Sequence, residues 1–136
     1  MGKRHGDRRP RTLYHFTSVH HLSHIKADGF LKATESNLSF LREHAGPDVV
    51  WFLDTPTADD APHGLVNAYV DKKAVRISVR AVGERWLDWV VRQPGFDADT
   101  MDILIRTGGG DEAAAHWWVV EGKVRASAWM AIDILK

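Results

Sequence analysis

Cysteine is missing from this chain of 136 residues. Its absence excludes thiol catalysis, thiolate metal sites and a disulfide framework together, and it fits a protein of the reducing cytoplasm. Long apolar runs are missing as well. No stretch approaches the roughly 18 residues that span a bilayer, and the first residues lack the apolar core of a signal peptide. We therefore expect a soluble, cytoplasmic protein with no membrane contact.

The sequence also lacks a phosphate-binding loop, a nucleophile elbow and an excess of one charge. The run 108–110 is all glycine, but no Gly-Lys-Ser/Thr follows it, and Asp111 and Glu112 would repel phosphate. The sequence contains no Gly-x-Ser-x-Gly element, so a nucleophile elbow is excluded. The 18 basic residues balance 18 acidic ones, which argues against a dedicated nucleic-acid module.

The composition suffices for one globular domain. Hydrophobic residues make up 44% of the chain, enough for a core that folds without metals or disulfides. Residues 1–11 are predicted to form a flexible basic arm, and residues 12–136 a single domain. The arm is rich in arginine, including Arg8, Arg9 and Arg11. It either contacts the phosphates of a DNA or RNA acceptor or serves as a solubilising terminus.

The first ordered unit is predicted to be a strand, a capped helix and a second strand. Residues 13–16 read as a short strand, and Thr17 or Ser18 can cap a helix over residues 19–27. Asp28 and Gly29 end that helix, and residues 30–33 can form the next strand.

Strands outnumber helices in the rest of the chain. Residues 49–53 form a continuous apolar run typical of a buried central strand. Apolar and polar residues alternate over residues 74–81, as in a strand with one solvent-exposed face. Residues 84–91 are predicted to form an aromatic-rich helix or turn, and residues 101–106 a helix or a strand. Residues 117–124 are predicted to form a hairpin or a bulged strand around Glu121 and Gly122. Residues 129–135 are predicted to form a closing strand with Met130, Ile132 and Ile134 on one face. This pattern favours an α+β fold over a doubly wound sheet.

Histidine is frequent, and two histidines stand one helical turn apart. His20 and His24 occupy positions i and i+4 of the predicted helix, which would let both face one metal ion. The glutamate of a His-Glu-x-x-His motif is missing, because Leu22 and Ser23 lie between His21 and His24. We interpret these histidines as residues of the polar face, with metal binding as the alternative.

His15 is the more informative histidine. On a strand starting at Leu13, His15 and Thr17 share one face with Leu13, while Tyr14 and Phe16 share the other. The aromatic pair can then anchor the strand while the histidine faces a cleft. The alternative is a histidine whose ring is satisfied by backbone hydrogen bonds. By the same alternation, the adjacent Trp117 and Trp118 must point to opposite faces of a later strand.

The segment from Leu13 through Ser18, followed by a helix that ends Asp28-Gly29-Phe30-Leu31, resembles the opening of the ADP-ribosyltransferase superfamily. It looks most like the compact branch of DarT-like DNA-modifying enzymes and related phage and bacterial proteins. The run 49–54 resembles the central strand of such proteins, and the run 117–124 resembles their late strand. The resemblance implies a single α+β domain around a split, twisted, mostly antiparallel sheet with short helices.

The resemblance also implies NAD as substrate and a set of residues to hold it. His15 would bond the ribose, Thr17 would add a hydroxyl, and Trp51 or Phe52 would offer an aromatic surface to nicotinamide. The full set of expected NAD contacts is Tyr14, His15, Phe16, Thr17, Asn37, Trp51, Phe52 and Trp117.

The family also uses a catalytic glutamate, which stabilises the positive charge that develops as nicotinamide leaves. The place just ahead of Trp117 is held by Ala115 and His116, so Glu121, Glu112 and Glu35 are the candidates, with Glu121 preferred.

The leading hypothesis is therefore an NAD-dependent ADP-ribosyltransferase that modifies a macromolecule, possible acceptors being DNA or RNA. One alternative is an inactive module of the same fold that binds a nucleotide, nucleic acid or protein. The other is an NAD-dependent RNA 2'-phosphotransferase, although the arginines that would grip its phosphate are not assigned.

Overall fold

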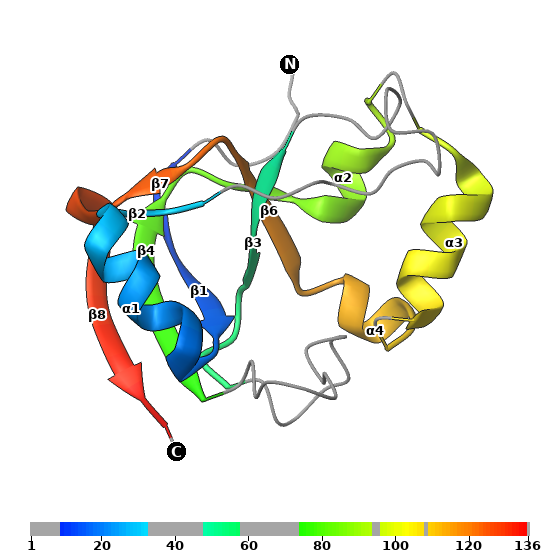
Figure 1. The fold of residues 1–136 in the computed structure, drawn as a ribbon. Coiled ribbons are helices and arrows are strands. Elements are labelled where there is room, and N and C mark those ends of the chain that lie inside the picture. The colour runs from blue at the N-terminus through cyan, green and yellow to red at the C-terminus, as the bar shows by residue number, and fades with distance from the viewer. Residues whose placement is uncertain (1–8, 33–47, 58–73, 94–95, 108, 136) are drawn as a thin grey trace.

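The fold is given by a computed structural model that describes residues 9–32, 48–57, 74–93, 96–107 and 109–135. Its centre is a six-stranded sheet in the order β5-β6-β3-β1-β4-β8 (Figure 1). The strands are β1 Arg11–Thr17, β3 Val49–Leu53, β4 Val75–Ala81, β5 Glu84–Arg85, β6 Trp117–Glu121 and β8 Trp129–Ile134. A small second sheet pairs β2 Phe30–Leu31 with β7 Val124–Arg125. The mostly antiparallel sheet with short helices confirms the predicted α+β class.

The strands β1 and β3 are neighbours in the large sheet but are only sparsely paired. β1 pairs with β4 along its whole length, from Arg11 opposite Ala81 to Thr17 opposite Val75. β3 likewise pairs with β6 along its whole length. Between β1 and β3, in contrast, the described residues form a single pair, Tyr14 opposite Leu53. We call this sparsely paired junction, which lies beside His15, the split between β1 and β3.

The helix α1, Val19–Asp28, begins and ends as predicted, at Ser18 and Gly29. Ser18 is the N-cap, and its Oγ accepts a hydrogen bond of 3.1 Å from the backbone N–H of His21. Gly29 closes the helix in the left-handed conformation, with φ 77°, and its N–H donates to the carbonyl of Ile25. Leu22 is the buried residue of α1 and attaches it to the sheet.

The two faces of the sheet carry separate hydrophobic cores. The α1 face is covered by α1 and the small sheet, while the opposite face is covered by α2 Trp86–Val90, α3 Ala98–Thr107 and α4 Asp111–Ala114 (Figure 1). We call the latter the α2 face. Trp117 packs into the core of the α2 face and Trp118 into that of the α1 face, as the alternation predicted.

The strand predicted from Trp117 forms, but neither the hairpin nor the bulged strand predicted around Glu121 and Gly122 does. The strand β7 pairs with β2 instead of β6, because Gly122, with φ 79°, turns the chain away at the end of β6. A one-turn 3-10 helix, Ala126–Ala128, then leads to β8.

The prediction that Met130 shares a face with Ile132 and Ile134 is also wrong. Val79 pairs with Trp129 and Ser78 with Ala131, so an irregularity in the register leaves Met130 out of the ladder. Its sulfur lies 3.9 Å from Oγ1 of Thr12, which is on the opposite face of β1 from Leu13, whereas Ile132 packs with the core that contains Leu13.

The ambiguous segment 101–106 belongs to a helix, α3, which begins at Ala98. The Asp97 carboxylate accepts hydrogen bonds from the N–H of Asp99 and, at 2.7 Å, from the hydroxyl of Thr100. The Thr100 hydroxyl lowers the pKa of Asp97. None of the described helices has the length and apolar character needed to cross a membrane.

Candidate functional site

His15 lies where β1 and β3 separate. Its Nδ1 is 2.9 Å from the carbonyl oxygen of Trp51, and because a carbonyl only accepts, Nδ1 carries the hydrogen. The ring lies edge-on to Phe52, with the centroids 5.8 Å apart. The His15 imidazole thus donates a hydrogen bond to the Trp51 carbonyl, close to Tyr14 and Leu53, which form the single described pair between the two strands. A backbone bond does satisfy this histidine, but at one nitrogen, which leaves Nε2 as an acceptor.

The surroundings of His15 favour a neutral ring. Burial lowers the pKa of His15, and the hydrogen bond to the Trp51 carbonyl opposes this only in part. A neutral imidazole with its hydrogen on Nδ1 presents a lone pair on Nε2. Such a nitrogen can accept a hydrogen bond from a hydroxyl group, including a ribose hydroxyl.

A carboxylate and a second histidine meet at the ends of the neighbouring strands. Asp54 directly follows β3 and His116 directly precedes β6. Asp54 Oδ1 accepts a hydrogen bond of 2.8 Å from His116 Nδ1, and Oδ2 accepts one of 3.1 Å from Trp118 Nε1. The backbone N–H of Asp54 also donates to the carbonyl of His116. Both carboxylate oxygens are therefore fixed by side chains of one strand end.

The sheet register brings this pair together. Leu53 is opposite Trp117, so the residues that follow and precede them, Asp54 and His116, become neighbours although they are 62 positions apart. The turn before β6 is held as well, because Arg85 donates to the carbonyl of Ala115 at 3.1 Å. The imidazole thus has a fixed orientation.

The Asp54–His116 pair has the chemistry of a general base. Since Nδ1 donates to the carboxylate, Nε2 is the basic nitrogen, and the negative charge of Asp54 stabilises the ring when it takes up a proton. The side chain of His116 is 46% exposed and that of Asp54 is 23% exposed. A substrate can therefore reach the base while its carboxylate partner remains largely covered.

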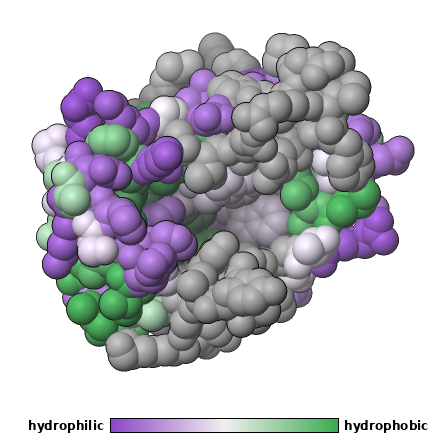
Figure 2. Space-filling view, in the orientation of Figure 1, coloured by the Kyte–Doolittle hydropathy of each residue, from purple (hydrophilic) through white to green (hydrophobic). Residues whose placement is uncertain are grey.

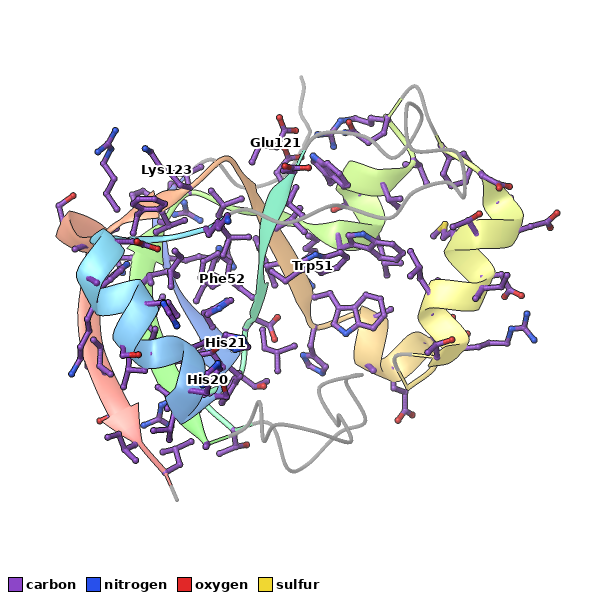
Figure 3. All side chains as sticks on the ribbon, in the orientation of Figure 1. His20, His21, Trp51, Phe52, Glu121 and Lys123 are labelled. Carbon is purple, nitrogen blue, oxygen red and sulfur yellow. The ribbon has the colours of Figure 1, made fainter. Side chains whose placement is uncertain are left out.

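Aromatic rings surround Trp51 on the α2 face. The ring centroid of Trp51 lies 5.9 Å from that of Trp86 and 6.0 Å from that of Trp117. Trp51 is partly exposed, whereas Trp86 is fully buried. Figure 2 shows a hollow between the polar surface over α1 and the apolar surface over α3, and Figure 3 places Trp51 in the middle of the same view. The partly exposed indole can contact a flat ring there.

The structure distributes the predicted NAD contacts over both faces of the sheet. Three lie on the α1 face, namely His15, Thr17 and Phe52, and four pack with the α2 face, namely Tyr14, Phe16, Trp51 and Trp117. Phe52 and Trp51 accordingly point to opposite sides of β3 (Figure 3). Asn37 and Glu35 lie outside the described residues.

Neither of the described candidate glutamates is placed beside His15. Glu121 ends β6 opposite Val49, far from the Asp54 end of β3 (Figure 3), and its carboxylate accepts a hydrogen bond of 2.7 Å from Trp89 Nε1 on the α2 face. Glu112 is exposed on α4. The carboxylate that the structure fixes at the end of β3 is that of Asp54, which the sequence identified only as the end of a strand.

The basic arm is described only at its end. Arg8 lies outside the described residues, and Arg9 is exposed. Arg11 is the first residue of β1, and its guanidinium carbon lies 4.2 Å from the ring centroid of Trp118. Arg85 approaches the same ring, at 5.1 Å. Arg11 thus belongs to the folded domain, one residue earlier than predicted.

Comparisons with known proteins identify no relative. No protein-family model matches the chain, and no match was found among curated proteins or solved structures. The candidate site is therefore defined by the arrangement of its own residues.

Proposed function

We propose that the protein binds NAD at the split between β1 and β3 and transfers ADP-ribose to a nucleophilic group of a macromolecule. The observation that carries the proposal is the placement of His15 and the Asp54–His116 pair around one strand pair. Tyr14 and Leu53 form the pair between β1 and β3, and because these strands are antiparallel, His15 lies on the Phe52 side of this pair and Asp54 on its other side. The α+β fold and the sequence resemblance of the segment 13–31 support NAD as the substrate.

Each residue has a defined task in this proposal. The lone pair on His15 Nε2 accepts a hydrogen bond from a ribose hydroxyl, and the partly exposed Trp51 packs against the nicotinamide ring. As the bond between ribose and nicotinamide breaks, its electron pair leaves with nicotinamide and positive charge grows on the sugar. The Asp54 carboxylate supplies negative charge near this position.

His116 acts on the acceptor. The acceptor nucleophile forms a bond to the ribose carbon that nicotinamide leaves, and its proton passes to Nε2 of His116. The hydrogen bond of 2.8 Å from Nδ1 to Asp54 stabilises the imidazolium formed in this step. In this proposal Glu121 is a structural residue that holds Trp89.

A module that binds NAD without turnover is the second candidate. It is favoured by one observation, the position of Glu121 on the α2 face, away from His15. Such a protein would keep the surfaces for ribose and nicotinamide and lack the transfer step.

Release of nicotinamide distinguishes the two candidates. NAD is added to the purified chain with DNA, RNA or protein as acceptor, while binding is followed by the thermal shift and nicotinamide by chromatography. We expect NAD to raise the melting temperature and nicotinamide to be released with one acceptor class. Binding without release would establish the binding module. If NAD neither binds nor is cleaved, the proposed function is wrong.

A further inference from the structure

Three histidine side chains gather on the exposed side of α1. His20, His21 and His24 are all exposed, and Figure 3 shows His20 and His21 at the beginning of this helix. The ring centroid of His20 lies 5.4 Å from that of His21 and 5.8 Å from that of His24, each edge-on. This cluster takes no part in the proposed transfer of ADP-ribose.

The three imidazoles differ in their hydrogen bonds and ring contacts. His21 Nδ1 lies 2.9 Å from Oγ of Ser18, the residue that caps the helix. Between His20 and His24 the contact is between the rings alone. The first turn of α1 has no acidic residue that would pair with them. Among the described residues, both ring nitrogens of His20 and of His24 are without a hydrogen bond, whereas His21 keeps only its Nε2 for an external ligand.

The separation of these two rings suits chelation. Two imidazoles that share a tetrahedral Zn²⁺, each at a Zn–N distance of about 2 Å, have ring centres about 5 Å apart. The observed 5.8 Å differs from this by an amount that small side-chain rotations can close. The helix backbone already holds residues i and i+4 on one side, so little conformational freedom is lost when a metal binds.

We propose that His20 and His24 form a two-histidine site for a divalent transition-metal ion such as Zn²⁺ or Ni²⁺. Neutral imidazole is a good ligand for these ions, whereas Mg²⁺ and Ca²⁺ require oxygen ligands. In the part of the chain that the structure describes, no group of three or more metal-ligating side chains converges. The protein therefore supplies two ligands, and water or a further molecule completes the coordination. This site is independent of the proposed activity.

Metal titration of the full chain without a histidine tag tests the proposal. Binding of Ni²⁺, Zn²⁺ and Mg²⁺ is measured by calorimetry and by the shift in melting temperature. We expect Ni²⁺ and Zn²⁺ to bind and to raise the melting temperature, since the chelate exists only in the folded helix, and Mg²⁺ to have no effect. Absence of Ni²⁺ and Zn²⁺ binding would overturn the proposal.

Three single variants locate the ion. His20→Gln and His24→Gln should each weaken Ni²⁺ binding at least about tenfold, because either leaves a single imidazole. His21→Gln is the matched control and should bind as the wild type does. Circular dichroism verifies that all three remain folded, as expected for exposed positions. Unchanged affinity in His20→Gln and His24→Gln would place the ion elsewhere, and an equal loss in His21→Gln would replace the pair by a three-histidine cluster.

Discussion

At the scale of single residues, His15 combines a structural and a proposed chemical task. Its Nδ1–H donates a hydrogen bond to the Trp51 carbonyl at the split between β1 and β3. This bond fixes the tautomer in which Nε2 is the acceptor. The side chain therefore contributes to stability whether or not a ligand is present. The sequence predicted the face on which His15 lies but not its partner, because the partner is a backbone atom of a strand 36 positions away.

The state of His15 predicts how stability depends on pH. Burial lowers the pKa of its ring from 6.5, so the unfolded chain binds this proton more readily than the folded chain. The contribution of His15 to the free energy of unfolding is complete above pH about 6.5 and is lost as the pH falls below that value.

His15→Asn can keep the donor to the Trp51 carbonyl but does not titrate. We therefore expect the melting temperature of the wild type to fall more between pH 7 and pH 5 than that of His15→Asn, as measured by calorimetry. Parallel pH profiles for the two proteins would contradict this interpretation of the buried ring.

At the scale of elements, local signals were sufficient where both ends of an element are marked in the sequence. α1 begins at Ser18 and ends at Gly29, as those residue types predict. The start of α3 also carries such a signal, since the Asp97 carboxylate bonds to the first turn, and this signal would have separated helix from strand in the segment 101–106. The pairing of β7 with β2 depends on contacts between distant segments, which turn residues alone do not reveal.

The end of α1 gives a prediction about stability. Gly29 has φ 77°, and a Cβ added there would meet no atom within 4 Å, so backbone strain is the main penalty for a side chain. Gly29→Ala should lower the free energy of unfolding by about 1 kcal/mol, and Gly29→Asn by less, because asparagine tolerates this conformation.

Urea denaturation measures both Gly29 variants. Equal stability of Gly29→Ala and the wild type would show that the helix end is not fixed in this conformation.

At the scale of the whole molecule, the site arises from the division of the sheet. The class of fold followed from strand patterns, and the opposite orientations of Trp117 and Trp118 followed from alternation along one strand. The Asp54–His116 pair was not predicted, since it depends on which strands are neighbours and on their register. Once Leu53 is known to pair with Trp117, it follows that Asp54 and His116 are neighbours.

The central claim is that the chemistry depends on the carboxylate of Asp54 and not on that of Glu121. Asn in place of Asp54 has one acceptor oxygen, but His116 Nδ1 and Trp118 Nε1 both need one. The amide would therefore turn the His116 ring to the other tautomer and remove the base, as well as the negative charge. Glu121→Gln is the matched change, because it also replaces a carboxylate by an amide and can still accept from Trp89.

The most direct test is the rate of nicotinamide release from NAD by the wild type, Asp54→Asn and Glu121→Gln with the same acceptor. We expect Asp54→Asn to lower this rate by about 10²-fold or more, while Glu121→Gln stays near the wild-type rate and both variants remain folded. Loss of release in Glu121→Gln together with a wild-type rate in Asp54→Asn would contradict the account.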